Sequence, residues 1–395
     1  PHHRGAGGRP RLRNVAGAPA PERHASTLEL FFDMVFVVAV AELADLLVHH
    51  PSPAGLAHYV ALFVPVWWAW VGYTFYADRF DGDDLTHRGT MIAAMLAVVA
   101  LAATIPDAFS EHGSIRFVLS YLAVRVLLIL LYIRAHRHVP EARPLTGRYL
   151  VVFASGAGLW LASLLVEPPD RFWLWGAGML VELLPPLVFT RVITSLPFHL
   201  SHIPERFGLF TIIVLGESVA LGALGIAGHD PTPLAGVVWT GGLLIAAAQW
   251  WLYFDCLDHR PLRRWRLTGQ AYLYGHLLIF AGITASGAAT LLALESGVDA
   301  GPLDAATLWM LCGGIAAFLL GAGFIHYVAT APRGDPQAWT RLGLGAAVLA
   351  FAALLPGLPV IAVEAVLLAG LVAQVAFELT LLSRRFGGDV AAAAT

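Results

Sequence analysis

The sequence contains no lysine, only two cysteines and few charged residues of either sign. Charged residues make up 13% of the 395 positions and hydrophobic residues 58%, with a mean hydropathy of +0.70. Soluble domains have about 25% charged and about 45–50% apolar residues, so a soluble globule is excluded. Cys256 and Cys312 both lie in apolar runs, which suggests neither a metal site nor a redox pair. A net charge of −3 offers no basic surface for nucleic acid.

Long apolar runs fill most of the chain and predict an all-α, polytopic transmembrane helical bundle. A bilayer core about 30 Å thick needs roughly 20 apolar residues per helix. The runs are continuous rather than alternating, which argues against strands. The stretches that we expect to span the membrane, about twelve in number, are residues 27–48, 56–76, 88–107, 115–134, 147–166, 171–194, 207–227, 233–254, 269–295, 303–330, 340–355 and 359–382.

The distribution of arginine predicts the orientation of this bundle. All 24 basic residues are arginine, and 21 of them fall on one side of the twelve-span map. Arg116 and Arg171 fall on the other side, and Arg125 falls within a span. Because positive charge is retained in the cytoplasm, we expect both termini to be cytoplasmic. Residues 1–26 are predicted to be a disordered, arginine-rich tail without a signal peptide, and residues 386–395 a C-terminal tail.

The two halves of the chain share short patterns in the same order. The tripeptide Pro-Glu-Arg occurs at 21–23 and again at 204–206, each time before the first span of a half. The second span of each half ends on Tyr-x-Asp-x-x-Asp. Six spans are an even number, so the halves would share their orientation as a 6+6 parallel repeat. We expect the halves at 27–194 and 207–385, joined by a cytoplasmic connector at 195–206.

Ionisable side chains within the spans are the main candidates for function, because a charge at the bilayer centre costs at least about 2.5–3.5 kcal/mol. Glu29 and Asp33 are four residues apart and share a helix face. The repeat places Asp33 opposite Glu217, which predicts a shared cavity with two carboxylates suited to proton exchange. The alternative is that each carboxylate caps a backbone or pairs with an arginine. The other proton or substrate candidates are Ser218, Arg125, Glu182 and His276.

Two of these candidates have open interpretations. Arg125 needs an anion, and either Glu182 or a carboxylate of the first span would serve. His276 has the alternative of being a packing residue. A further pattern, His-x-x-His-x-x-Glu at His199, His202 and Glu205, has metal-ligand spacing, but we expect it to form a connector helix with exposed imidazoles.

Aspartate clusters follow the second and eighth spans. They comprise Asp78 and Asp81 in the first half and Asp255 and Asp258 in the second. Two such clusters on one membrane face are candidates for holding Mg²⁺ through oxygen ligands, as paired aspartate motifs do in prenyltransferases. The alternative, which we favour, is that they are solvated helix ends paired with nearby arginines.

Two blocks resemble a known family. They are R-H-A-S-T-L-E-L-F-F-D-M-V-F-V-V-A-V-A-E-L from residue 23 and H-L-S-H-I-P-E-R-F-G-L-F-T-I-I-V-L-G-E-S-V from residue 199. Together they resemble the bacterial low-temperature-requirement A (LtrA) family, over about residues 22–385. The resemblance implies a multi-pass inner-membrane protein linked by name to growth in the cold, without an agreed activity. The residues that match the family motifs are Glu29, Phe31, Phe32, Asp33, Glu205, Arg206, Gly216, Glu217 and Ser218.

Three functions remain open, and we favour the first. They are a proton-linked secondary transporter of a small solute, an intramembrane enzyme acting on an isoprenoid or lipid, and a non-catalytic membrane-homeostasis protein. The sequence has no nucleotide-binding loop and neither Gly-x-Ser-x-Gly nor His-Glu-x-x-His. We expect no cofactor, except a divalent cation such as Mg²⁺ under the enzyme alternative. The expected partners are membrane lipids and a small-molecule or lipid substrate, not nucleic acid.

Overall fold

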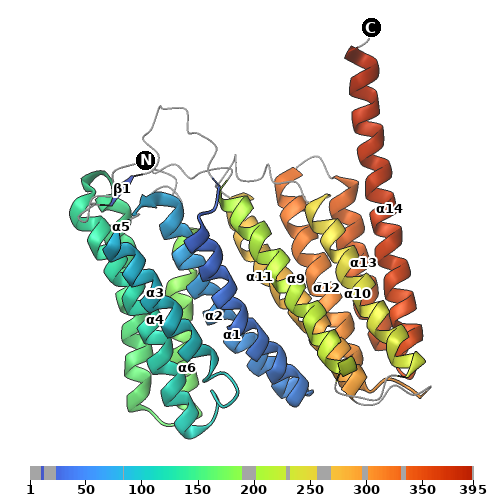
Figure 1. The fold of residues 1–395 in the computed structure, drawn as a ribbon, viewed down its shortest axis with the longest axis horizontal. Helices are drawn as coiled ribbons and strands as arrows, with labels where there is room; N and C mark the ends of the chain where they lie inside the picture. The colour runs from blue at the N-terminus through green and yellow to red at the C-terminus, as the bar shows by residue number, and fades with distance from the viewer. Residues whose placement is uncertain are drawn as a thin grey trace. The chain divides into compact units, whose positions relative to one another are not determined.

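A computed structural model describes residues 10–12, 24–82, 84–188, 202–227, 232–255, 268–295, 301–330 and 335–393. This part of the chain is almost entirely helical, which confirms the all-α bundle (Figure 1). The chain divides into two compact units, each described here by itself. The first contains Pro1–Leu46 and Ala57–Phe210, and the second contains Leu47–Leu56 and Thr211–Thr395.

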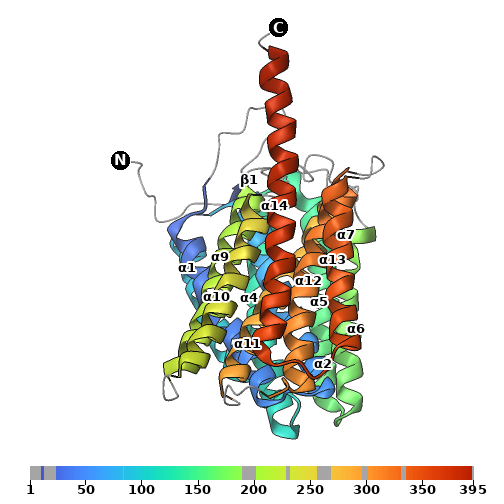
Figure 2. The same cartoon turned by 90° about the vertical axis from the view of Figure 1, so that its right-hand side faces the viewer.

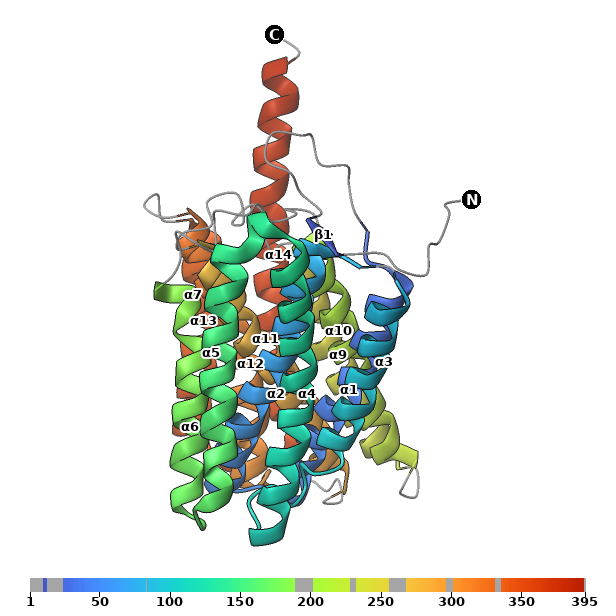
Figure 3. The same ribbon diagram turned by 90° about the vertical axis from the view of Figure 1, so that its left-hand side faces the viewer.

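The first unit is built mainly from the helices α1 to α6. Within it, α3 packs on α4, α4 on α5 and α5 on α6 (Figure 3). A two-residue strand β1 (Arg11–Leu12) pairs antiparallel with β2 (Phe80–Asp81). The helices are α1 (Thr27–His49), α2 (Pro53–Arg79), α3 (Leu85–Ala102), α4 (Glu111–His138), α5 (Arg143–Ala162), α6 (Asp170–Leu183) and α7 (Pro185–Val188), with 3₁₀ turns at Pro140–Ala142 and Ser163–Leu165.

The second unit is built mainly from α9 to α14, although α9 begins in the first unit. Here α12 packs on both α11 and α13, and α10 packs on α14, whose final turns extend past its neighbours (Figure 2). The helices are α9 (His202–Ala227), α10 (Pro233–Phe254), α11 (Thr268–Glu295), α12 (Ala305–Thr330), α13 (Pro336–Leu354) and α14 (Val360–Ala393).

Each predicted span overlaps one of the helices α1–α6 or α9–α14. Among the described residues, ten helical segments are long and apolar enough to cross a membrane by length and composition. The predicted spans outside this set are α1, which carries four carboxylates, and α6, which has 14 residues. At 1.5 Å per residue α6 reaches only about 21 Å, less than a bilayer core.

Side-chain caps set several helix starts. Asp84, Ser110, Thr232 and Asp335 each accept a hydrogen bond from a backbone N–H in the first turn of α3, α4, α10 and α13, respectively. Such caps satisfy donors that have no partner within the helix. In α10 and α13 a proline follows the cap directly, at a position where its missing N–H costs nothing.

Glycine permits a close helix contact in the second unit, between α11 and α12. A Cβ on Gly282 would lie 2.5 Å from the carbonyl oxygen of Gly314, and a Cβ on Gly314 would lie 2.7 Å from that of Gly282. A side chain at either position would therefore collide with backbone. Small residues bring membrane helices together in this way.

Candidate functional site

The site begins at the first turn of α1, where Glu29 is held by a capping box. The Ser26 N–H donates to Glu29 Oε2 at 2.7 Å, and the Glu29 N–H donates to Ser26 Oγ at 3.3 Å. This reciprocal pair satisfies two backbone donors at the helix start. The sequence signal of this box is Ser-x-x-Glu, and the box agrees with the alternative that a carboxylate of α1 caps a backbone. The capping box leaves Glu29 Oε1 for contacts with α9.

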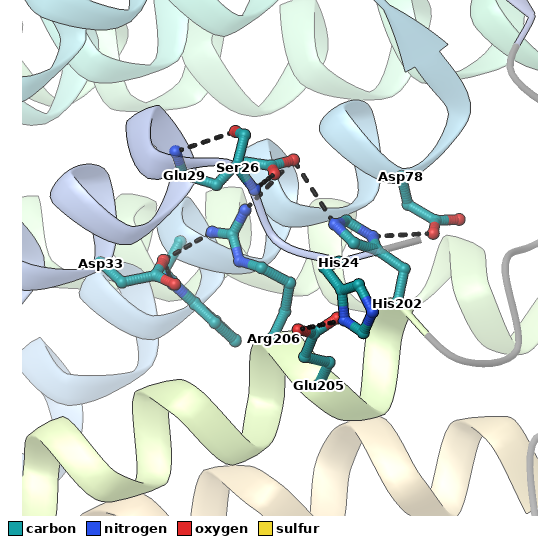
Figure 4. A network of polar contacts seen from close by, with 9 residues as sticks. His24, Ser26, Glu29, Asp33, Asp78, His202, Glu205 and Arg206 are labelled. Carbon is teal, nitrogen blue, oxygen red and sulfur yellow. Dashed lines mark hydrogen bonds and ion pairs between the residues drawn. The ribbon is translucent and has the colours of Figure 1, made fainter. Parts of the chain in front are cut away.

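Asp33 lies one turn further along α1 and is fully buried. Its Oδ1 accepts hydrogen bonds from Trp70 Nε1 at 2.7 Å and from Arg206 Nη2 at 2.5 Å (Figure 4). The Trp70 ring stacks on Phe210 and meets the edge of Phe207. Asp33 Oδ2 has no hydrogen-bond partner among the described residues. The carboxylate is therefore fixed on one oxygen while the other remains available.

Two residues at the start of α9 contact these carboxylates. Arg206 Nη1 lies 3.6 Å from Glu29 Oε1, so the guanidinium contacts both acids of α1. His202 lies between two carboxylates: Nδ1 is 3.1 Å from Asp78 Oδ1, and Nε2 is 3.5 Å from Glu29 Oε1 (Figure 4). The donor and acceptor roles of the ring nitrogens depend on the tautomer. All five of these side chains are buried.

The expectation of exposed imidazoles is wrong for His202, which is 0% exposed. The helix begins at this residue, so His202 and Arg206, four positions apart, share the buried face. Glu205 lies nearer the surface, and its Oε1 is 3.2 Å from His24 Nδ1. His199 lies outside the described residues.

The Asp33 and Glu217 carboxylates belong to different units, so their predicted meeting stays a prediction. Asp33 pairs with an arginine, which was the alternative interpretation. Glu217 is half-buried on α9, and the adjacent Ser218 is buried. Gly216 has open space where a Cβ would stand.

The two phenylalanines of the first motif differ in environment. Phe31 is 58% exposed on α1, whereas Phe32 is fully buried and contacts the rings of Phe36 and Tyr73. Phe32 is therefore a core residue of the first unit.

Arg125 on α4 pairs with Glu182 on α6, which decides between the anions that we considered. Both side chains are buried, and the guanidinium lies 4.6 Å from the centre of the Phe153 ring. Gly156 on α5 provides the space, because a Cβ there would lie 2.5 Å from Glu182 Oε1. This pair joins two helices within the first unit.

The second unit has its own buried ion pair, which the sequence did not indicate. Arg341 on α13 donates from Nε and Nη2 to the two oxygens of Glu378 on α14, at 2.7 and 2.6 Å. Gln374 donates to the same carboxylate at 2.7 Å. Bidentate pairs of this kind are among the strongest charged hydrogen bonds.

His276 in the second unit contacts two tyrosines. Its Nε2 is 2.8 Å from the Tyr253 hydroxyl, and its Nδ1 is 2.6 Å from the backbone oxygen of Tyr272. The ring is fully buried.

The aspartate clusters are described only in part. Asp78 contacts His202, and the backbone of Asp81 pairs with that of Arg11. Asp255 is exposed at the end of α10, and Asp258 lies outside the described residues. Within the described ranges no group of three or more His, Cys, Asp or Glu side chains is arranged to hold a metal ion.

Asp84, which follows the first aspartate cluster in the chain, has a structural role. It caps α3 and accepts a hydrogen bond from Arg134 at 2.7 Å. Burial raises the pKa of the Asp84 carboxyl, but the hydrogen bonds from Arg134 and from the His87 N–H outweigh burial and hold the pKa below its usual value.

Comparison with known proteins gives two matches. The family model described as bacterial low temperature requirement A protein (LtrA) matches residues 24–376. A protein of Rhizobium meliloti (strain 1021), described as uncharacterized, is 30% identical over 279 residues, which cover 66% of this chain and 67% of that protein.

Proposed function

This chain belongs to the bacterial low temperature requirement A family, and we propose that it is a proton-linked secondary transporter of a small solute. The family name states a requirement and no reaction, so the proposal is argued from the charged side chains in the interior of the protein. The ten long apolar helices among the described residues are what a multi-pass membrane transporter requires. We place the protein in the bacterial inner membrane with both termini cytoplasmic, as the arginine distribution predicts.

The observation that carries the proposal is the position of His202 between Glu29 and Asp78. An imidazole can receive a proton on one ring nitrogen and release one from the other. Here each ring nitrogen faces a carboxylate, and the imidazole is 0% exposed. Chains of acidic and histidine side chains within membrane segments are typical of proton relays in pumps and transporters.

The network brings acidic and basic side chains of α1, α2 and α9 together. Glu29, Asp33 and Asp78 contribute carboxylates, and the Arg206 guanidinium contacts two of them (Figure 4). A proton added to the imidazole or to a carboxylate changes the charge of the network by one unit. Uncompensated charge is costly in a low-dielectric interior, so protonation and the arrangement of the pairs are energetically coupled.

The Asp33–Arg206 contact links this protonation to helix movement. It joins α1 to the first turns of α9. Protonation of Asp33 would remove the ionic part of the contact, and Arg206 would keep only Glu29. The start of α9 would then have a second stable position relative to α1, which alternating access requires.

The contact between Asp78 and His202 also bears on the enzyme alternative. Asp78 is the first residue of the predicted metal cluster, and here its Oδ1 contacts an imidazole. This use of the carboxylate favours a proton network over a magnesium diphosphate site.

Solid-supported membrane electrophysiology on proteoliposomes tests the proposal. The full chain would be exposed to a panel of amino acids, sugars, polyols and organic acids at fixed pH. We expect one class to evoke a transient current that Asp33→Asn abolishes and that Asp107→Asn, which removes a carboxylate from an exposed ion pair, retains. A folded protein without current for any class, or with the same current after Asp33→Asn, would contradict transport.

A further inference from the structure

A second polar site lies within the second unit, where α9, α10 and α11 meet. The hollow there has about 310 Å³ of empty space including its open mouth. The space enclosed within it is enough for about one water molecule. The innermost occupant is therefore a group of one heavy atom.

Glycines bring the three helices close enough to form this hollow. A Cβ on Gly287 of α11 would lie 2.3 Å from Ser218 Oγ of α9. A Cβ on Gly242 of α10 would lie 2.6 Å from Thr290 Cγ2 of α11. The hydroxyl-bearing residues of two helices are thus held near α10.

Gln249 of α10 supplies the polar group that points to a ligand. Its side chain lines the hollow and is 0% exposed. Neither Oε1 nor Nε2 has a hydrogen-bond partner among the described residues. An unsatisfied buried polar group is expensive, and native proteins keep one where something else completes its hydrogen bonds.

The remaining polar lining determines the chemistry of the occupant. Ser286 Oγ donates to the Ile283 carbonyl, and Thr290 Oγ1 donates to the Ser286 carbonyl. Their protons are therefore used within α11, and their lone pairs are available as acceptors. The hollow offers the Gln249 amide nitrogen as a buried donor without a partner among the described residues, beside the acceptor oxygens of Gln249, Ser286 and Thr290.

The residues that line the hollow exclude most other ligands. None of them is charged, so an ion would enter without a counter-charge, which is unfavourable in a membrane interior. A cation would also leave the Gln249 N–H unsatisfied. A hydroxyl group is the size of a water molecule, accepts one hydrogen bond and donates another.

We propose that this hollow is a binding site for a hydroxyl group, held by Gln249 with Ser286 and Thr290. The hydroxyl belongs to a water molecule or to an alcohol whose alkyl chain lies along Trp239 and Leu243 at the apolar part of the lining. The site is independent of the proton network in the first unit and does not require transport. Ser218, a residue of the family motif, lies in its wall.

Photolabelling in lipid nanodiscs distinguishes the two sources. The probe is a long-chain primary alcohol with a diazirine on its alkyl chain, and its methyl ether is the control ligand. If an alcohol is the occupant, the alcohol labels segments 218–222, 239–249 and 286–290, and the ether does not. Gln249→Leu should reduce this labelling about tenfold, the equivalent of one hydrogen bond. Thr240→Val, which removes an exposed hydroxyl from the same helix, should leave it unchanged.

An experimental structure of the unmodified chain, resolved well enough to show water, completes the test without any variant. An isolated density within hydrogen-bond distance of both amide atoms of Gln249 identifies water, and a density that continues into a tail identifies an alcohol. Both results support the site. A hollow without density, with the Gln249 amide bonded to protein groups, would overturn it, as would strong labelling of these segments by the alcohol and the ether alike.

Discussion

Arg206 Nη2 lies 2.5 Å from Asp33 Oδ1, although the two residues are 173 positions apart in the chain. Asp33 ends the Leu-Glu-Leu-Phe-Phe-Asp block, and Arg206 belongs to the Glu-Arg-Phe-Gly-Leu block. The two sequence blocks that mark the family therefore meet in one buried contact. A third contribution comes from α2, through Trp70 and Asp78.

Removal of Arg206 should destabilise the first unit strongly. Arg206→Met leaves Asp33 and Glu29 buried without their cation, and loss of one partner of a buried pair costs about 3–5 kcal/mol. The double variant with Asp33→Asn should lose less than the sum of the two single variants. Reversible unfolding in mixed micelles measures these free energies. If the losses of unfolding free energy in the two single variants add up to the loss in the double variant, Asp33 and Arg206 are not energetically coupled.

The control for this experiment is the exposed pair of Arg116 and Asp107, whose side chains are 60% and 40% exposed. Arg116→Gln should cost no more than about 1 kcal/mol, because surface ion pairs contribute little. A loss of unfolding free energy equal to that of Arg206→Met would mean that burial does not determine how much these ion pairs stabilise the fold.

Gly156→Ala should disturb the Arg125–Glu182 pair. The new Cβ would lie 2.5 Å from Glu182 Oε1, so the carboxylate must shift within a packed interior, at a cost of about 1–3 kcal/mol. Gly158 is on the same helix and has open space around its Cβ position, so Gly158→Ala should be neutral or stabilising. Thermal unfolding of both variants is the measurement. Equal effects at the two positions would refute the predicted clash.

Gly282→Ala should separate α11 from α12. Its Cβ would meet the Gly314 oxygen at 2.5 Å and the Phe318 nitrogen at 2.7 Å, and backbone atoms cannot rotate away. We expect a loss of thermal stability and of folded yield. Gly313 on α12 has no atom near its Cβ position, so Gly313→Ala is the matched control. Wild-type stability of Gly282→Ala would contradict the close helix contact.

Asp84 predicts a stability difference that depends on pH. Its pKa in the folded protein lies below the unfolded value of about 3.9, so the ionised form stabilises the fold above that pH. This contribution is lost as the pH falls through the folded pKa. Asp84→Asn keeps a helix cap but removes the charge that faces Arg134. The melting temperatures of wild type and variant should therefore differ near neutral pH and converge in acid. A gap that is constant with pH would contradict this.

The sequence predicted the helical architecture because twelve apolar runs leave few alternatives in a bilayer. It also indicated that Glu29 and Asp33 share a face, since this follows from helix periodicity. It could not identify Arg206 as their partner, because a contact over 173 residues depends on how helices pack. The burial of His202 was missed because we expected a connector helix with exposed imidazoles, whereas His202 lies on the buried face of α9. The capping role of Glu29 agrees with the alternative that each carboxylate caps a backbone or pairs with an arginine, and Ser26 three residues earlier is its sequence signal.

Proton movement in proteoliposomes loaded with a pH-sensitive dye tests the central claim most directly. The measurement compares wild type, His202→Gln and His112→Gln, which removes an exposed imidazole from the start of α4. With the solute that evokes a current, the account predicts internal acidification in wild type and in His112→Gln. It predicts none in His202→Gln, provided that this variant folds. Acidification by folded His202→Gln at the wild-type rate would contradict the claim that the buried imidazole carries the proton.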